Sequence, residues 1–124
     1  MKLSHVGIVA NDIEEMRYWY MRYFALTSSP LYRNDATRVT CYFLYWPDTD
    51  GAQIEILHYD GRTVDPSVNH VAISTGSREG VNFLTELLRT DGNQIVAEPF
   101  ETPAGTYLAI CLDPEGNRVE IVDR

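Results

Sequence analysis

The sequence contains an internal repeat, and this repeat constrains the fold more than any other feature. The segment His5–Ile8 returns as His70–Ile73, and the segment Gln53–Leu57 returns as Arg118–Val122. Both segments return after 65 residues, so each half of the chain holds one histidine and one glutamate at the same spacing. A repeat of this length cannot bury a helix and a sheet on its own, so we expect the two halves to pack together.

Length and charge limit the classes of protein to which the chain can belong. A chain of 124 residues is expected to form one domain, made of two repeats at about residues 1–65 and 66–124. The net charge of −8, with Lys2 as the single lysine, argues against binding to nucleic acid or to an anionic membrane surface. No apolar run approaches the ~20 residues that cross a bilayer, and the N-terminal residues show no hydrophobic region of the kind found in a signal peptide. We therefore expect a cytoplasmic protein.

Hydrophobic periodicity and turn residues predict the element order β-α-β-β-β in both halves, and therefore an α+β fold. In the first half we expect a helix from a cap at Asn11 or Asp12 to about Phe24, and strands at residues 2–10, 28–33, 38–46 and 52–58. Residues 59–67 are expected to form a linker. In the second half we expect strands at residues 68–74, 94–101, 107–112 and 118–122, and a helix from a cap at Ser77 to about Thr90. Its inward-facing residues are expected to be Val81, Leu84, Leu87 and Leu88.

The period of two along a strand decides which side chains share a face of the sheet. In the first strand Ile8 points one way and His5 the other, and in the fourth strand Ile56 and Glu55 alternate in the same manner. We expect the apolar side chains to face the helix. If the first and fourth strands are neighbours, each repeat then presents one His/Glu pair on the opposite face, namely His5 with Glu55 and His70 with Glu120.

Two histidines and two glutamates suit a transition-metal ion. Imidazole and carboxylate together suit Zn, Ni, Co, Mn or Fe(II), and the set is too rich in nitrogen for calcium. Taken alone, a histidine in a strand is usually a hydrogen-bonded structural residue, and a glutamate between two isoleucines usually faces solvent. The match of residue type, strand face and spacing in both halves favours a metal site with the ligands His5, Glu55, His70 and Glu120.

The remaining histidine and the two cysteines are given structural roles. His58 ends a strand and has no histidine at the repeat position, so we expect a surface or strand-end residue. Cys41 and Cys111 lie in strand-like runs with no redox or metal motif around them, and we expect buried thiols.

Some other residues are candidates for contact with a substrate. Tyr42 lies in a strand rich in aromatic residues, some of which could line a cleft. Arg38 and Arg118 could bind an anionic group, although a solvated side chain explains Arg38 better.

The repeated segments resemble the vicinal oxygen chelate superfamily, which includes glyoxalase I, bleomycin-resistance proteins, methylmalonyl-CoA epimerase and extradiol dioxygenases. The resemblance rests on His5–Ile8, on Asn69–Ile73 and on the ending Leu112–Ile121, and it covers nearly the whole chain. It implies paired βαβββ modules that form a cupped mixed sheet around a metal ion. In that superfamily the ligands come from the first and fourth strands of each module, and the matching positions are His5, Glu55, His70 and Glu120.

The four-residue set is most similar to bacterial glyoxalase I, whose members often use nickel or cobalt rather than zinc. The resemblance implies a homodimer and a lyase or isomerase of the lactoylglutathione lyase type. The metal would bind two adjacent oxygens of a small substrate and stabilise an enediolate, while Glu120 or Glu55 moves a proton between neighbouring carbons.

The sequence departs from glyoxalase I where that enzyme binds glutathione. An arginine usually follows the first ligand, but this chain has the segment Gly7–Ala10, and an asparagine usually follows the second ligand, where this chain has Tyr59-Asp60. The resemblance to glyoxalase I therefore supports the metal site better than it supports a glutathione-linked substrate. Three other classes remain open: an epimerase-like enzyme with a different acid as substrate, an extradiol dioxygenase, and a resistance-type protein that binds a small molecule without metal.

Overall fold

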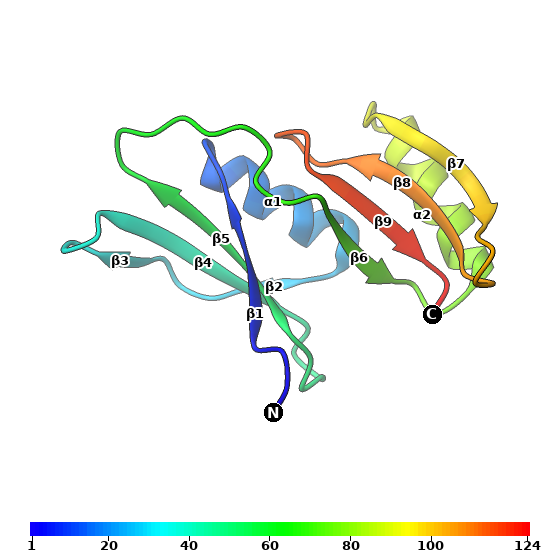
Figure 1. The fold of residues 1–124 in the computed structure, drawn as a ribbon, viewed down its shortest axis with the longest axis horizontal. Coiled ribbons are helices and arrows are strands. Elements are labelled where there is room, and N and C mark those ends of the chain that lie inside the picture. Colours follow the sequence, from blue (N-terminus) through cyan, green and yellow to red (C-terminus); the bar gives the residue numbers. More distant parts are fainter. The chain divides into compact units, whose positions relative to one another are not determined.

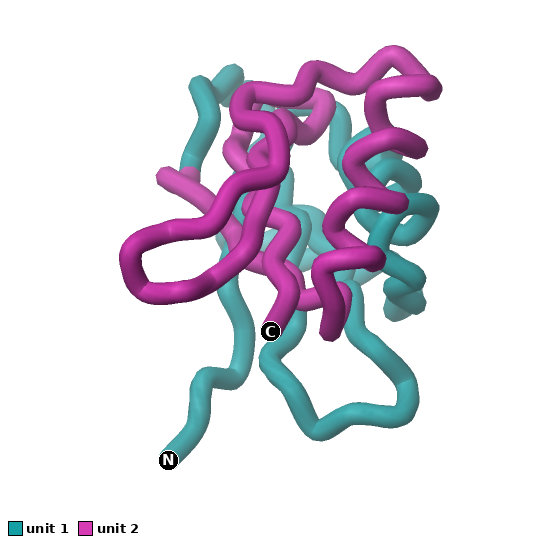
Figure 2. The backbone as a smooth tube through the Cα atoms, turned by 90° about the vertical axis from the view of Figure 1, so that its right-hand side faces the viewer, with its two compact units in different colours: residues 1–67 teal, residues 68–124 magenta.

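The chain divides into two compact units, residues 1–67 and residues 68–124, which Figure 2 shows in different colours. The computed structural model describes all residues from 1 to 124. Each unit combines one helix with its own mixed sheet, so the protein has an α+β fold with two βαβββ-like modules. Neither helix is both long and apolar enough to span a membrane.

The first unit consists of β1 (His5–Val9), α1 (Ile13–Phe24), β2 (Thr27–Ser28), β3 (Tyr32–Asn34), β4 (Val39–Tyr45) and β5 (Gln53–Tyr59). Its strand order is β1-β5-β4-β2, and β3 also pairs with β4 (Figure 1). β5 runs parallel to β1 and antiparallel to β4. The strand that comes last in this unit therefore lies inside the sheet, directly beside the strand that comes first.

The second unit repeats this arrangement. It consists of β6 (His70–Ser74), α2 (Arg78–Thr90), β7 (Ile95–Glu101), β8 (Tyr107–Leu112) and β9 (Arg118–Val122). Its strand order is β6-β9-β8-β7, with β9 parallel to β6 and antiparallel to β8. The first and last strands are again neighbours, which is the condition on which the expected His/Glu pairs depend.

The main difference from the expected elements lies in the segment 28–33. We expected one short strand interrupted by Pro30, and the segment instead contributes to two short strands, β2 and β3, on either side of this residue. Proline has no backbone N–H to donate to a neighbouring strand, so the pairing with β4 breaks there.

Helix α1 begins and ends at residues with recognisable capping roles. The carboxylate of Asp12 accepts a hydrogen bond from the backbone N–H of Glu15 (2.9 Å). After Phe24 the chain leaves the helix through Ala25, which adopts a left-handed conformation with φ of 53°. The helix packs against β4 and β5, and its buried residues are Met16, Trp19, Tyr20 and Phe24.

Helix α2 begins at Ser77, whose hydroxyl accepts a hydrogen bond from the backbone N–H of Gly80 (3.0 Å). The expectation that Leu87 faces inward is wrong, because this side chain is 37% exposed. Thr85 is buried on this helix instead, and its hydroxyl donates a hydrogen bond to the carbonyl of Val81 (2.7 Å). The hydroxyl is thus satisfied within the helix, which allows a polar residue to face the sheet.

The alternation along the strands is confirmed by burial. Six apolar residues of the first and last strands are at most 5% exposed, namely Ile8, Ile54, Ile56, Ile73, Val119 and Ile121, while Val6 and Val71 near the strand starts are half-buried. Helix α1 covers this face in the first unit and α2 in the second. The alternating positions, which include the four candidate ligands, therefore lie on the face opposite the helix.

The turn that leads into β9 is built around a buried carboxylate. Asp113 is 4% exposed and accepts hydrogen bonds from the backbone N–H of Glu115 (3.0 Å) and from the backbone N–H and side-chain amide of Asn117 (2.9 and 2.8 Å). This turn fixes the start of the strand that carries Glu120. The equivalent residue of the first repeat, Asp48, is exposed and makes no side-chain hydrogen bond.

We expect Asp113→Ala to lower the free energy of unfolding by about 2 to 4 kcal/mol, because three N–H donors would lose their acceptor in a buried turn. Asp48→Ala removes the same side chain at the equivalent position and should change this free energy by less than about 0.5 kcal/mol. Urea unfolding followed by circular dichroism measures both values. Equal losses in the two variants would show that the buried turn has no special role.

Candidate metal and substrate site

The first unit places His5 and Glu55 side by side on the sheet face opposite α1. In the parallel pair of β1 and β5, His5 lies opposite Gln53, and Glu55 lies opposite Gly7. The imidazole Nε2 of His5 is 3.5 Å from Oε2 of Glu55. The two side chains are 44% and 19% exposed, so a small ion could reach both from solvent.

The second unit repeats the register on β6 and β9, but His70 and Glu120 form no ion pair. His70 lies opposite Arg118, and Glu120 lies opposite Ala72. The side-chain oxygen of Asn69 is 2.8 Å from Nδ1 of His70. Because an amide oxygen only accepts hydrogen bonds, Nδ1 carries the proton and the lone pair of Nε2 is available to a metal ion.

The two glutamates differ in their surroundings. Glu55 has the thiol of Cys41 as a polar neighbour on the same face. Glu120 is half-buried, makes no hydrogen bond or ion pair, and lies opposite Ile110 of β8. The apolar cluster to which Ile110 belongs also contains Leu108 and Val122.

Each unit therefore places one of the expected pairs on neighbouring strands, but only the first unit brings the two side chains close together. Within a unit, no group of three or more His, Cys, Asp or Glu side chains takes up metal-binding geometry. The chemistry of the donor set nevertheless fits a divalent transition metal, because two imidazole nitrogens and two carboxylates lie on the sheet faces opposite the helices. The strand faces of the candidate ligands are confirmed, and the site with four ligands stays a prediction.

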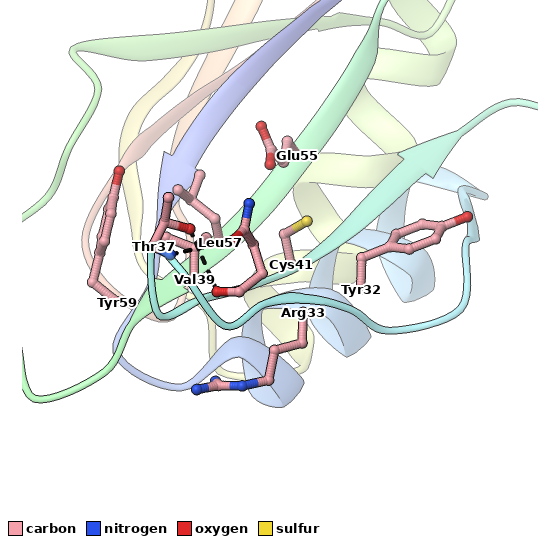
Figure 3. Close-up of a pocket in the computed structure, with 9 residues that line it drawn as sticks. Tyr32, Arg33, Thr37, Val39, Cys41, Glu55, Leu57 and Tyr59 are labelled. Atoms are coloured by element: carbon pink, nitrogen blue, oxygen red, sulfur yellow. Dashed lines mark hydrogen bonds between the residues drawn. The ribbon is translucent and has the colours of Figure 1, made fainter.

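A pocket of about 510 Å³ lies beside Glu55 in the first unit (Figure 3). Tyr32 and Tyr59 stand on opposite sides of it. Glu55 belongs both to the pocket and to the His/Glu pair, so a molecule bound in the pocket would lie next to that pair. The full lining is Tyr32, Arg33, Asn34, Thr37, Val39, Cys41, Glu55, Leu57 and Tyr59.

The cation in the pocket wall is already neutralised. Arg33 donates hydrogen bonds to the carboxylates of Asp60 and Asp35, both at 2.8 Å. These bonds raise the pKa of Arg33 above its usual value, and the bond from Arg33 lowers the pKa of Asp60. The pocket therefore offers no unpaired positive charge to an anionic ligand.

Cys41 is half-buried and lines the pocket, whereas we expected a fully buried thiol. Burial and the neighbouring Glu55 raise its pKa to about 11, so the side chain is a neutral thiol at physiological pH. Cys111 is buried as expected, and burial raises its pKa to about 12. Both cysteines are free of disulfides.

The aromatic residues of the pocket are not the ones that the sequence suggested. Tyr42 is buried on the helix side of β4, and its hydroxyl donates a hydrogen bond to Glu14 of α1 (2.5 Å). The pocket tyrosines are Tyr32 and Tyr59. Tyr59 could have been found, because it shares the strand parity of Glu55, but the place of Tyr32 in the lining depends on the pairing of β3 with β4.

His58 is the penultimate residue of β5, as the expected strand-end position requires, and it is half-buried. Its Nδ1 donates a hydrogen bond to the backbone carbonyl of Ala10 (2.9 Å). This bond joins β5 to the end of β1 and gives His58 a structural role. The other arginine considered for substrate binding, Arg38, is 70% exposed at its side chain and lies 3.8 Å from Asp60.

The sequence matches the model of the Glyoxalase/Bleomycin resistance protein/Dioxygenase superfamily over residues 2–121, so the chain belongs to this superfamily. No curated protein matches the chain by sequence.

Solved structures of the superfamily share the fold. Glyoxalase I from Zea mays superimposes with a TM-score of 0.80 at 22% identity, and the match covers 99% of this chain but 44% of the maize chain. A superfamily domain from Frankia sp. EAN1pec gives a TM-score of 0.82 at 20% identity, covering 98% and 96% of the two chains. Lactoylglutathione lyase from Agrobacterium tumefaciens gives 0.71 at 14% identity, covering 97% and 91%. At these identities the likeness establishes the fold alone.

We expect Cys41 to react slowly with iodoacetamide at pH 8 and about tenfold faster for each unit of pH until the pH approaches 11, because only the thiolate reacts. Glu55→Gln removes a negative neighbour, lowers the pKa of this thiol and should raise the rate at pH 8. Mass spectrometry measures alkylation of each cysteine, and the buried Cys111 serves as the internal control. An unchanged rate in the Glu55→Gln variant would show that the carboxylate has no influence on the thiol.

Proposed function

We propose that the chain is a metal-dependent enzyme of the glyoxalase type, a lyase or isomerase that acts on a small substrate with two adjacent oxygen atoms. The observation that carries the proposal is the duplicated His/Glu pair. His5 with Glu55, and His70 with Glu120, occupy the same register positions on equivalent pairs of parallel strands. A purely structural role would not require the same two residue types at both places, since flanking positions such as Val9 and Ser74 differ.

The two pairs would supply four ligands to one divalent ion, which we take to be Ni, Zn or Co. The hydrogen bond from His70 to Asn69 supports this assignment, because it holds the imidazole in the tautomer that can coordinate a metal. The resemblance to glyoxalase I also supports a homodimer as the working form.

A bound divalent ion would supply the positive charge that stabilises an enediolate. The protein itself must move a proton between adjacent carbon atoms, and carboxylates are suited to this task. We assign the transfer to Glu120 in the first place, because its carboxylate makes no hydrogen bond or ion pair that would have to break. Glu55 is the second candidate, although it already lies near His5.

The pocket beside Glu55 supports a second candidate function. A protein of the resistance type would use this cavity of about 510 Å³ to hold a small molecule and would need no metal. Metal binding distinguishes the two functions, since only the enzyme requires a metal ion held by the histidines of both repeats.

We expect the purified protein to bind about one Ni, Zn or Co ion for each set of four ligands, and His70→Ala to weaken metal binding at least a hundredfold because one nitrogen ligand is lost. Elemental analysis and competition with a chromogenic chelator measure this. His58→Ala is the matched control, because it removes a histidine outside the site and should leave metal affinity unchanged. Metal binding that is insensitive to His70 would favour the sequestering protein.

We expect Glu120→Gln to lower kcat by at least about a hundredfold while the fold survives, because an amide cannot accept the substrate proton. Turnover of methylglyoxal with glutathione is the first assay, and deuterium exchange into 2-oxo and 2-hydroxy acids in heavy water is the second. Glu86→Gln on the exposed surface of α2 is the control. Full activity of the Glu120→Gln variant in either assay would remove Glu120 from the mechanism.

A further inference from the structure

Arg118 is the one cationic side chain of this protein that has no partner. The chain contains ten lysines and arginines among eighteen acidic residues. Nine of the ten contact a carboxylate, a hydroxyl, a carbonyl oxygen or an aromatic ring. Arg118 makes no hydrogen bond, ion pair or ring contact, and its side chain is exposed. In a chain of net charge −8, Arg118 stands out because it has neither a carboxylate nor any other polar or aromatic partner.

The position of Arg118 is as informative as its lack of a partner. In the parallel pair of β6 and β9 it lies directly opposite His70. It also precedes Glu120 by two residues, so both side chains project from the same face of β9. Arg118 therefore occupies a position on the same sheet face as both candidate ligands of the second unit and adjacent to each of them in register.

The equivalent position of the first unit carries an uncharged residue. The equivalent residue is Gln53, which lies opposite His5 and precedes Glu55 by two residues. Both Gln53 and Arg118 can donate hydrogen bonds on the ligand face, but only Arg118 adds a positive charge. One of the two equivalent positions has thus become cationic.

The charge balance of the proposed metal site indicates what this cation binds. Two carboxylates neutralise a divalent ion, so Arg118 leaves the set with one positive charge in excess. A cation beside a metal ion is repelled unless an anion lies between them. A guanidinium binds a carboxylate with two parallel hydrogen bonds, which is the strongest arrangement for such a pair.

We propose that Arg118 binds the carboxylate of the substrate, and that the substrate is therefore a small 2-oxo or 2-hydroxy carboxylic acid. The inference rests on the proposed metal-dependent function and narrows its substrate class. A glutathione hemithioacetal fits less well, because its adjacent oxygens are uncharged. Its charged tripeptide would also find no unpaired cation in the pocket beside Glu55, where Arg33 is held by two aspartates.

The test uses oxalate as the probe, because it combines adjacent oxygens with negative charge. The metal-loaded wild type is compared with Arg118→Gln and Arg118→Lys by calorimetric titration. We expect Arg118→Gln to weaken oxalate binding at least about tenfold, as the loss of a charge-assisted hydrogen bond predicts, and Arg118→Lys to retain part of the affinity. In the absence of oxalate, Arg118→Gln should bind the metal several times more tightly, because a repelling charge is gone.

Arg89→Gln is the matched control. It changes the net charge by the same amount in the same unit, but Arg89 lies on α2 and pairs with Glu86 and Glu98. Its oxalate and metal affinities should equal those of the wild type. Because Arg118 is exposed and makes no bonds, its replacement should leave the thermal unfolding curve unchanged.

The outcomes separate this inference from the proposed function. If metal stays bound and oxalate binds the Arg118→Gln variant as tightly as the wild type, the role of Arg118 is overturned while the metal enzyme stands. A change of oligomeric state in the Arg118→Gln variant would assign Arg118 to a contact between subunits and would also overturn it. If the wild type binds no divalent metal, the proposed function fails, and the inference fails with it.

Discussion

The rest of this structure depends on the parallel pairing of the first and last strands in each module. This pairing brings residues that are far apart in the sequence into one register, which is the same in both modules. Since side chains alternate between faces, a slip of one residue would turn Glu55 or Glu120 toward the helix and place an isoleucine in its position. The burial of isoleucine under α1 and α2 therefore holds each glutamate on the sheet face opposite the helix. The pairing register of the first and last strands thus determines both which residues enter the core and which residues form the candidate site.

Much of this arrangement could be predicted from the sequence. The repeat, the alternation around Glu55 and Glu120 and the helix caps are local signals, and burial and pairing confirm the faces and caps that they indicated. The errors occur where a tertiary contact decides the outcome. Leu87 is exposed, and the buried position on α2 is taken by Thr85, whose hydroxyl is satisfied within the helix. Cys41 belongs to a pocket whose far side comes from β3, a strand of three residues with little sequence signal.

Duplication has produced two halves that share a backbone but differ in chemistry. Glu55 has a thiol beside it, and Glu120 lies opposite an apolar residue of a buried cluster. Gln53 and Arg118 occupy equivalent positions and differ in charge. The proposed metal site would be symmetric in its metal-ligating residue types and asymmetric in the surroundings of those residues. Asymmetry of this kind allows two carboxylates of identical type to take different roles, because the environment sets the behaviour of an ionisable group.

The interior position of the last strand in each sheet also has a consequence for folding. The only neighbour of β1 in its sheet is β5, which begins about fifty residues later in the chain, and the only neighbour of β6 is β9, at a similar separation. Pairing strands that are far apart in the sequence costs loop-closure entropy before the contacts form. The formation of these strand pairs, rather than of the helices, should therefore limit the folding rate. Until then, each opening strand exposes unpaired backbone that another chain could capture. The same strand order that places the candidate ligands on one sheet face thus makes the protein most prone to aggregation early in folding.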